Sequence, residues 1–125
     1  MRLLLDTHIF LWCIQGESKR TKSIRSKLLH ASEIYVSSAS IWEMTIKIKL
    51  NKLEGDISAI VEAISESGFL ELPITSAHAA AVSGLPDIHR DPFDRMLIAQ
   101  AISEPLTLLT ADVLLAQYTE LVQVI

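Results

Sequence analysis

Acidic residues recur at the points where predicted strands give way to helices. Asp6 follows the apolar run 3–5, Glu43 lies one to two turns into the helix after a second apolar run, and Asp112 follows a fourth. Asp94 joins them from the first turn of another predicted helix. Because parallel strands end at one edge of a sheet, several of these carboxylates are expected to meet there. Such a cluster suits Mg²⁺ or Mn²⁺, ions that can activate water for phosphodiester hydrolysis.

Each acid, taken alone, also has a structural explanation. Asp6 can cap a helix N-terminus, and Glu43 can complete a capping box with Ser40. Asp94 and Asp112 lie in first turns, where the helix dipole favours an acid. Considered together, the four acids favour a metal site over helix caps, because like charges gathered at one edge raise one another's pKa unless a cation relieves the repulsion. The ordered set therefore favours a metal centre over four separate caps.

Short apolar runs alternate with amphipathic segments along the whole chain. Strands are predicted at 3–5, 34–36, 69–72, 106–109 and 122–124. Helices are predicted from Asp6 or Thr7, over 19–30, 38–50, 57–67 and 76–82, from Asp91 to Ser103, and briefly after Thr110-Ala111-Asp112. This alternation predicts an α/β fold, a single domain over residues 1–125 with a central, mostly parallel sheet of four to five short strands flanked by helices.

The composition is richer in apolar residues than one core requires. Half of the 125 residues are apolar, yet no apolar run approaches the ~20 residues of a membrane-spanning helix. The first residues, Met1 to Asp6, become charged too early for a secretory signal. We therefore expect a cytoplasmic protein that does not enter a membrane, and we assign the apolar surplus to a subunit or partner interface.

Charge is divided unevenly along the chain. The net charge is −4, but residues 1–52 hold nine of the eleven Lys and Arg. One basic stretch contains Lys19, Arg20, Lys22, Arg25 and Lys27, and a second contains Lys47, Lys49 and Lys52. These stretches are either solvated helix faces or a track for a polyanion, and the first is expected on a helix near the acidic edge of the sheet.

Four segments, in order, resemble the motifs of the PIN-domain family. They are Leu3-Leu4-Leu5-Asp6-Thr7-His8, Ser37 to Glu43, Asp94-Arg95-Met96-Leu97-Ile98-Ala99, and Leu109-Thr110-Ala111-Asp112. The resemblance covers essentially the whole chain and is closest to VapC-type toxins; the run from His89 to Arg95 is similar to the third motif in one branch of them. It implies that the catalytic, metal-binding residues are Asp6, Glu43, Asp94 and Asp112. It also implies a supporting role for Thr110 and, less directly, for Thr7 and Ser38, whereas Asp91 is assigned as a helix cap.

The resemblance further implies an endoribonuclease that acts as the toxin of a toxin–antitoxin pair. Water activated by Mg²⁺ or Mn²⁺ would attack the phosphodiester bond of RNA, a tRNA or ribosomal RNA loop in related toxins, and leave a 5′-phosphate and a 3′-hydroxyl. The expected partners are the RNA, a VapB-type antitoxin and a second copy of the chain. The side chains expected to contact RNA are Lys19, Arg20, Lys22, Lys47 and Arg95.

Three other functions stay open. Phosphatases and phosphate-accepting receiver domains also begin with a strand that ends in Asp, but they use a lysine from the second half of the chain, and this chain has none after Lys52. The phosphatases also place an Asp where this chain has His8. A non-enzymatic α/β binding module, whose acids are all helix caps, would show no effect of divalent cations on its stability. A DNA-directed or flap-cleaving PIN enzyme is the third, although such proteins are usually longer.

Histidines and aromatic residues receive no catalytic assignment. His30, His78 and His89 have no metal-ligand spacing, and His8 is close enough to Asp6 to line the site, although packing against a helix is favoured. The aromatic residues Phe10, Trp12 and Trp42 fall on apolar faces of predicted helices, which favours a place in the core over base stacking.

Overall fold

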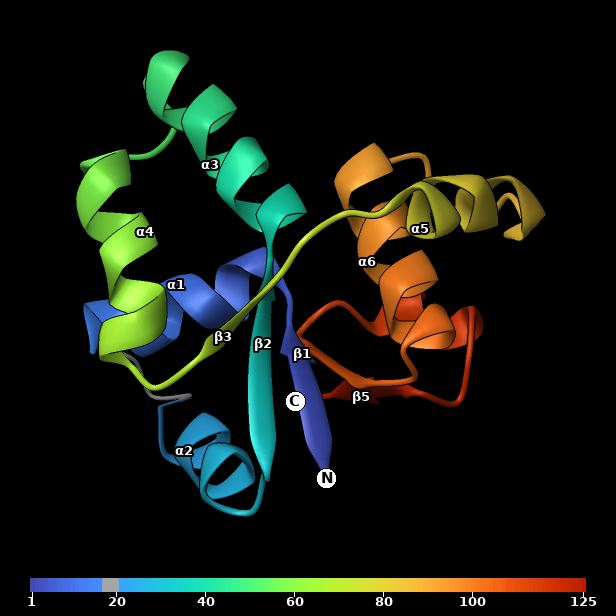
Figure 1. The fold of residues 1–125 in the computed structure, drawn as a ribbon, viewed down its shortest axis with the longest axis horizontal. Helices are drawn as coiled ribbons and strands as arrows, with labels where there is room; N and C mark the ends of the chain where they lie inside the picture. The colour runs from blue at the N-terminus through green and yellow to red at the C-terminus, as the bar shows by residue number, and fades with distance from the viewer. Residues whose placement is uncertain (17–20) are drawn as a thin grey trace.

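The computed structural model describes residues 1–16 and 21–125 as a parallel sheet with helices on both faces (Figure 1). The strands of the described chain are β1 Arg2–Leu5, β2 Glu33–Ser37, β3 Leu70–Leu72, β4 Thr107–Thr110 and β5 Val122–Val124. They lie in the order β3-β2-β1-β4-β5, and every neighbouring pair is parallel. The predicted α/β fold with a parallel sheet of short strands is confirmed.

Strand β1 lies at the centre of the sheet and is buried on both faces. Leu3 and Leu5 pack into one hydrophobic cluster with Phe10, whereas Leu4 packs into a second cluster with Leu97 on the opposite face. Successive side chains of a strand point to opposite faces, so a strand covered on both sides has no polar position. This double burial explains why residues 3–5 are an uninterrupted apolar run.

The helices follow the predicted order. They are α1 Thr7–Gln15, α2 Thr21–Leu29, α3 Ser38–Lys49, α4 Ile57–Glu66, α5 Ser76–Ala81 and α6 Pro92–Ser103, with 3₁₀ segments η1 Val82–Gly84 and η2 Val113–Gln117. Asp6 caps α1 by accepting from the Ile9 N–H, and Asp91 caps α6 ahead of Pro92. The brief helix expected after Asp112 is the 3₁₀ segment η2. Within the described residues, no helix combines the length and apolar composition needed to cross a membrane.

The connections between strands decide which segments lie at which edge of the sheet. Because all strands are parallel, β1, β2 and β4 end at one edge, where the chain enters α1, α3 and the turn before η2. Helix α2 directly precedes β2 and therefore lies near the opposite, amino edge, where the Ser32 N–H donates to the Met1 carbonyl (Figure 1). The expectation that this basic helix lies near the acidic edge is wrong for the part of it that the structure describes.

Candidate active site

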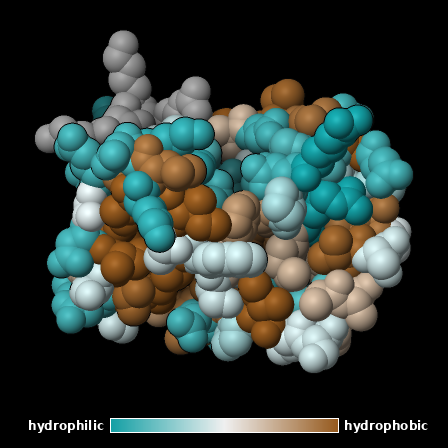
Figure 2. All heavy atoms as spheres, turned by 90° about the horizontal axis from the view of Figure 1, so that it is seen from above, coloured by the Kyte–Doolittle hydropathy of each residue, from teal (hydrophilic) through white to brown (hydrophobic). Residues whose placement is uncertain are grey.

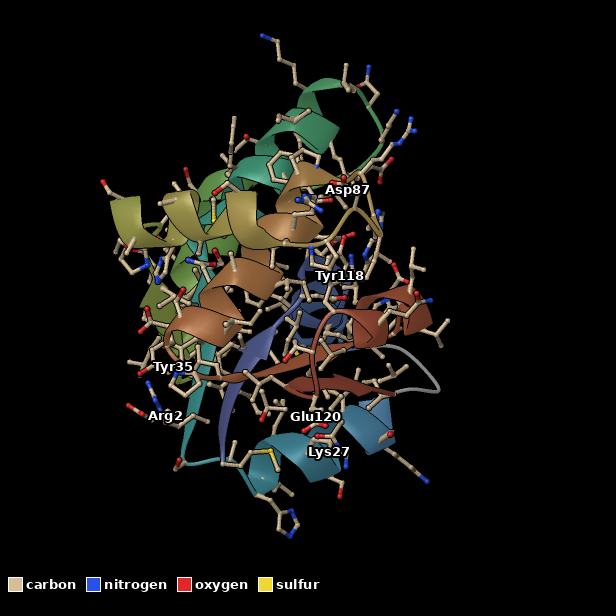
Figure 3. All side chains as sticks on the ribbon, turned by 90° about the vertical axis from the view of Figure 1, so that its right-hand side faces the viewer. Arg2, Lys27, Tyr35, Asp87, Tyr118 and Glu120 are labelled. Carbon is tan, nitrogen blue, oxygen red and sulfur yellow. The ribbon has the colours of Figure 1, made fainter. Side chains whose placement is uncertain are left out.

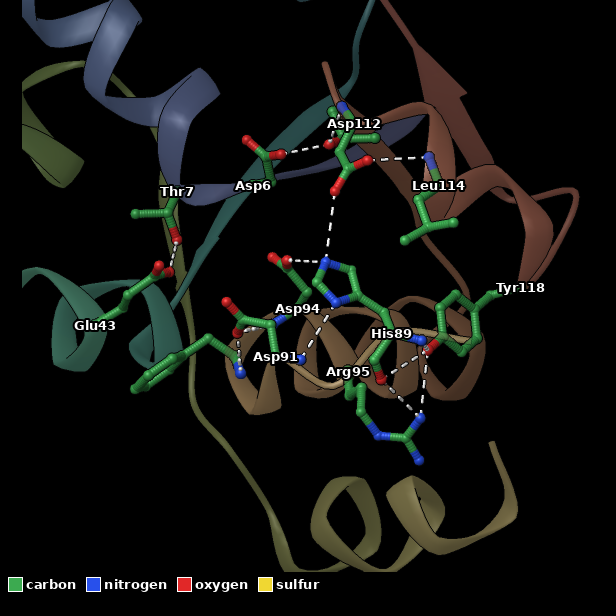
Figure 4. Close-up of polar contacts among 12 residues, drawn as sticks. Asp6, Thr7, Glu43, His89, Asp91, Asp94, Arg95, Asp112, Leu114 and Tyr118 are labelled. Carbon is green, nitrogen blue, oxygen red and sulfur yellow. Dashed lines mark hydrogen bonds and ion pairs between the residues drawn. The ribbon is translucent and has the colours of Figure 1, made fainter. Parts of the chain in front are cut away.

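Four carboxylates from four segments of the chain line one cleft at the carboxyl edge of the sheet (Figure 4). Asp6 follows β1, Glu43 lies in the second turn of α3, Asp94 in the first turn of α6, and Asp112 follows β4. The cleft has a volume of about 330 Å³, and its other polar side chains include His8, Lys47 and Asp91. The parallel topology thus brings together acids that are up to 106 residues apart in sequence.

Asp6 is buried and held by two hydrogen bonds. Its Oδ1 accepts the Ile9 N–H at 2.9 Å, and its Oδ2 accepts the hydroxyl of Thr110 from the neighbouring strand β4. Only 6 % of the residue is exposed. Burial raises the pKa of Asp6, and the hydrogen bond from Thr110 opposes that rise. Asp6 is therefore a helix cap with its second oxygen held at the cleft.

Glu43 is fixed by one neutral and one charged partner. The Thr7 hydroxyl lies 2.7 Å from Glu43 Oε1, and Lys47 Nζ lies 3.0 Å from Oε2, one turn further along α3. The capping-box interpretation of Glu43 is wrong, because α3 is capped by Ser37, whose Oγ accepts the Ala39 N–H. Ser40 lies inside the helix, with its Oγ 2.9 Å from the Thr7 hydroxyl. The structure thus leaves Glu43 directed at the cleft instead of at its own helix terminus.

Asp94 has the strongest electrostatic perturbation among the described acids of the cleft. Its pKa is raised to about 7, mainly by burial and in addition by the nearby carboxylates of Asp91, Glu43 and Asp6, whereas His89 opposes the rise. The side chain is 23 % exposed, so solvent reaches it only in part. A carboxyl group in this state is costly to ionise without an additional positive charge nearby.

The chemistry of the donor set fits a hard divalent cation. Carboxylate oxygens are the ligands that Mg²⁺ and Mn²⁺ prefer. Single ligand atoms of His89, Asp94 and Asp112 lie within 4.8 Å of one another. Among the described residues that line the cleft, Lys47 is the one lysine, and its ammonium group already pairs with Glu43. The acids therefore outnumber the fixed cations around them, and a bound cation would relieve the repulsion.

The sequence matches the family model for the PIN domain over residues 3–121. The chain belongs to the PIN-domain family. Family membership is consistent with the sheet order and excludes the phosphatase and receiver-domain interpretations, which belong to other folds. A comparison with curated protein sequences finds no match.

Solved structures similar to this PIN domain cover nearly its whole length. VapBC2 from Rickettsia felis, bound to a DNA fragment from their promoter, aligns with a TM-score of 0.74 and 16% identity over 98% of both chains. A toxin–antitoxin complex from Klebsiella pneumoniae aligns with a TM-score of 0.69 and 17% identity, covering 97% of this chain and 95% of the other. FitAcB from Neisseria gonorrhoeae aligns with a TM-score of 0.61 and 19% identity, covering 88% and 87%. At these identities the likeness establishes a shared fold.

The predicted supporting hydroxyls of the PIN domain separate into two groups. Thr110 and Thr7 contact Asp6 and Glu43 directly, as the preceding geometry shows. Ser38 does not reach the acids, because its Oγ accepts the Ile74 N–H and ties the segment after β3 to the start of α3. Ser40, which the sequence suggested only as a helix cap, lies beside Thr7 instead. The sequence held a signal for this position, because Ser40 and Glu43 are three residues apart and residues at that spacing lie on the same face of a helix.

The predicted RNA-contacting side chains that the structure describes, Lys22, Lys47 and Arg95, do not form one group. Lys19 and Arg20 fall outside the described residues. Lys22 is exposed in the first turn of α2, and Lys47 lies in the cleft. Figure 3 shows Lys27, further along α2, in the lower part of the molecule and Asp87 in the upper part, with Tyr118 between them. The described part of the basic stretch on α2 therefore does not continue along the acidic edge.

Arg95 has a structural role that the sequence did not reveal. Its Nη1 donates to the Pro86 carbonyl at 2.9 Å and approaches the His89 carbonyl at 3.4 Å, and its Nη2 lies 3.4 Å from the Val82 carbonyl. A guanidinium engaged by several carbonyls holds the segment before α6 in place. The assignment of Arg95 to RNA contact stays a prediction, and the structure adds these carbonyl contacts to it.

One aromatic residue and one histidine lie where the sequence did not place them. Phe10 is fully buried, as predicted, and Trp12 is half-buried, packs against the same core cluster and also lines the cleft. Trp42, in contrast, is 61 % exposed and meets Phe93 edge to face at 5.2 Å between ring centroids. His89, for which the sequence indicated no partner, lies against Asp94 and Asp112.

Proposed function

We propose that this PIN domain is a Mg²⁺- or Mn²⁺-dependent endoribonuclease that hydrolyses phosphodiester bonds of RNA. The observation that carries the proposal is the convergence of Asp6, Glu43, Asp94 and Asp112 on one cleft, with the pKa of Asp94 raised to about 7. A divalent cation held by these acids would acidify the attacking water and neutralise charge on the scissile phosphate. The four acids are its proposed ligands.

The protein's own side chains would prepare the cleft for this chemistry. Thr110 and the Ile9 N–H hold the two oxygens of Asp6, and Thr7 and Lys47 hold the two oxygens of Glu43. Each carboxylate oxygen has a further lone pair that could bind the cation. Lys47 neutralises Glu43 in the metal-free protein, and a cation bound at Glu43 would free its ammonium group to contact an RNA phosphate. These contacts give the site a defined geometry before metal and RNA arrive.

We further propose that the enzyme is the toxin of a toxin–antitoxin pair. Support comes from the resemblance of its motifs to VapC-type toxins and from its structural similarity to VapBC2 and to a toxin–antitoxin complex. The proposed protein partners are a VapB-type antitoxin and a second copy of the chain. Helix α3 and the Leu50 that follows it carry exposed apolar residues at Trp42, Ile46 and Leu50, spaced four apart, which a protein partner would cover. Figure 2, which views the molecule from above Figure 1, shows hydrophobic surface on the left of the molecule, the side on which α3 and α4 lie in Figure 1.

A cleavage assay with the purified toxin alone tests the enzymatic proposal. The substrates are tRNA, ribosomal RNA and a single-stranded DNA of matched length. We expect metal-dependent cleavage of RNA, with products that carry a 5′-phosphate and a 3′-hydroxyl. The variants Asp6→Asn, Glu43→Gln, Asp94→Asn and Asp112→Asn should each lose most activity while keeping the wild-type circular dichroism spectrum.

The matched control is Glu62→Gln, an exposed acid on α4 that should cleave RNA like the wild type. Near-normal activity in all four cleft variants would disprove the site. Cleavage of the DNA in preference to RNA would favour the DNA-directed alternative. Capture of a native complex with a tagged chain, followed by identification of the bound protein, tests the antitoxin partner separately.

A further inference from the structure

His89 lies against two acids of the cleft. Its Nε2 is 3.1 Å from Asp94 Oδ2 and 3.5 Å from Asp112 Oδ2 (Figure 4). The imidazole is 24 % exposed, so it is largely enclosed by the segments that carry these acids. One ring nitrogen therefore faces two carboxylates that belong to different elements of the fold.

The other ring nitrogen of His89 is occupied by a backbone donor. The N–H of Asp91 donates to Nδ1 at 3.2 Å. A nitrogen that accepts a hydrogen bond carries a lone pair, so the proton of the neutral imidazole is on Nε2. The hydrogen bond thus selects the tautomer whose N–H lies on the carboxylate side. It also leaves Nε2 without the lone pair that a metal ligand requires.

Asp94 depends on His89 more than the other acids do. Asp6 is held by Thr110 and a backbone N–H, and Glu43 is held by Thr7 and Lys47, as described above. Asp112 Oδ1 accepts the Leu114 N–H at 2.9 Å. Among the residues that the structure describes, the polar group within reach of the Asp94 carboxylate is His89 Nε2. Without the imidazole, the orientation of Asp94 would be set by its rotamer alone.

The backbone of His89 is itself clamped. The Tyr118 hydroxyl accepts the His89 N–H at 2.7 Å and lies 3.3 Å from the His89 carbonyl, which Arg95 also approaches. Arg95 and the Tyr118 hydroxyl are 3.3 Å apart. Arg95 follows Asp94 directly, and Tyr118 lies at the end of the 3₁₀ segment that Asp112 caps. The segments that carry Asp94 and Asp112 therefore also hold the backbone of His89 in place.

We propose that His89 is a positioning residue, whose Nε2 lies against the carboxylates of Asp94 and Asp112 and keeps them in the geometry that binds the metal, and that Tyr118 and Arg95 hold His89 in place for this role. The proposal rests on the proposed metal-dependent function. It assigns His89 to the support of two ligands and not to the ligand set itself. Removal of a group that orients a metal ligand typically weakens metal binding 10- to 100-fold.

Equilibrium binding of Mn²⁺ to the purified protein, measured by calorimetry without RNA, tests this role. His89→Ala should weaken Mn²⁺ binding about tenfold or more. His89→Gln should stay within about threefold of the wild type, because its amide N–H is the same number of bonds from the backbone as Nε2. Tyr118→Phe, which removes the hydroxyl of the clamp, should lie between the two. His30→Ala is the matched control, since His30 is exposed at the amino edge, and it should bind like the wild type.

A second readout separates a positioning residue from a ligand. Nitrogen-15 correlation spectra at pH 8 should show the His89 proton on Nε2, both in the metal-free protein and with saturating Mg²⁺. A change to the Nδ1–H tautomer on adding Mg²⁺ would make His89 a ligand and overturn the proposal. Unchanged Mn²⁺ affinity in His89→Ala, or a loss in His89→Gln as large as in His89→Ala, would overturn it too.

The same measurements distinguish this inference from the proposed function. If the wild type binds Mn²⁺ and Asp94→Asn does not, the metal centre stands, and the His89 variants alone decide the positioning role. If the wild type binds no Mn²⁺ at this site, the proposed function fails and the positioning role fails with it.

Discussion

Neutralising Asp94 should stabilise the metal-free protein, and more so at pH 8 than at pH 5. The pKa of this carboxyl is raised to about 7 from its usual 3.8, first by burial and then by the neighbouring carboxylates of Asp91, Glu43 and Asp6. Asp94→Asn keeps the shape of the side chain and removes the charge. The variant therefore removes a repulsion that the folded protein tolerates in order to keep four acids together.

The sign and size of the effect follow from the difference between folded and unfolded states. Between pH 4 and pH 7 the folded protein keeps a proton on Asp94 that the unfolded chain releases, so the wild type loses stability as the pH rises through this range. One pH unit is worth about 1.4 kcal/mol per proton. From pH 5 to the folded-state pKa near 7, the loss is at most about 3 kcal/mol. Because the side chain is 23 % exposed, we expect about 1–2 kcal/mol.

The measurement is urea unfolding of chelator-treated wild type and Asp94→Asn at pH 5 and pH 8. The difference in unfolding free energy between the two proteins should grow in favour of the variant by about 1–2 kcal/mol from the lower to the higher pH. Glu62→Gln controls for the loss of one surface charge and should change by less than about 0.5 kcal/mol at either pH. A variant that is destabilised at pH 8, or a difference that does not depend on pH, would refute the electrostatic argument.

Three further perturbations follow from the same geometry. Thr110→Val removes the hydroxyl that donates to buried Asp6, so it should lower the free energy of unfolding by about 1–3 kcal/mol and weaken Mn²⁺ binding. Equal stability and equal Mn²⁺ affinity would show that this hydrogen bond does not organise the site. Ca²⁺ should raise the unfolding midpoint of the wild type yet support little RNA cleavage, because its looser coordination misplaces the attacking water, and cleavage as fast as with Mg²⁺ would contradict this. Lys47→Gln should reduce the steepness of the plot of log affinity for single-stranded RNA against log salt concentration by about 0.7. Lys27→Gln, at the amino edge, should leave this slope unchanged. The reverse result would indicate that RNA binds along α2 instead.

The sequence predicted the sheet and the convergence of the acids for the same physical reason. Central parallel strands are buried on both faces, so they appear as continuous apolar runs such as residues 3–5, and parallel strands end at one edge. Given that topology, an acid that follows each run must lie near the others. The same rule contradicts the expectation that α2 lies near the acidic edge, because a helix directly before a parallel strand returns the chain to the amino edge.

The details that the sequence did not predict depend on contacts between distant residues. The role proposed for His89 depends on the Tyr118 hydroxyl, 29 residues away, which accepts the His89 N–H, and no local pattern encodes that contact. Trp42 shares an apolar helix face with Ile46, but periodicity alone cannot tell a face that packs on the sheet from one that awaits a partner. Arg95 is one residue from a proposed ligand, yet its donors are engaged by carbonyls that only the folded chain brings near.

A parallel titration of metal binding and RNA cleavage tests the central claim most directly. Mg²⁺ or Mn²⁺ is added to chelator-treated wild type and Asp6→Asn, without antitoxin, and both bound metal and cleaved RNA are measured on the same samples. We predict that binding and cleavage rise together in the wild type and that both are lost in the variant. Full cleavage by the wild type in excess EDTA, or metal-dependent cleavage retained by Asp6→Asn, would contradict a catalytic centre built from these four acids.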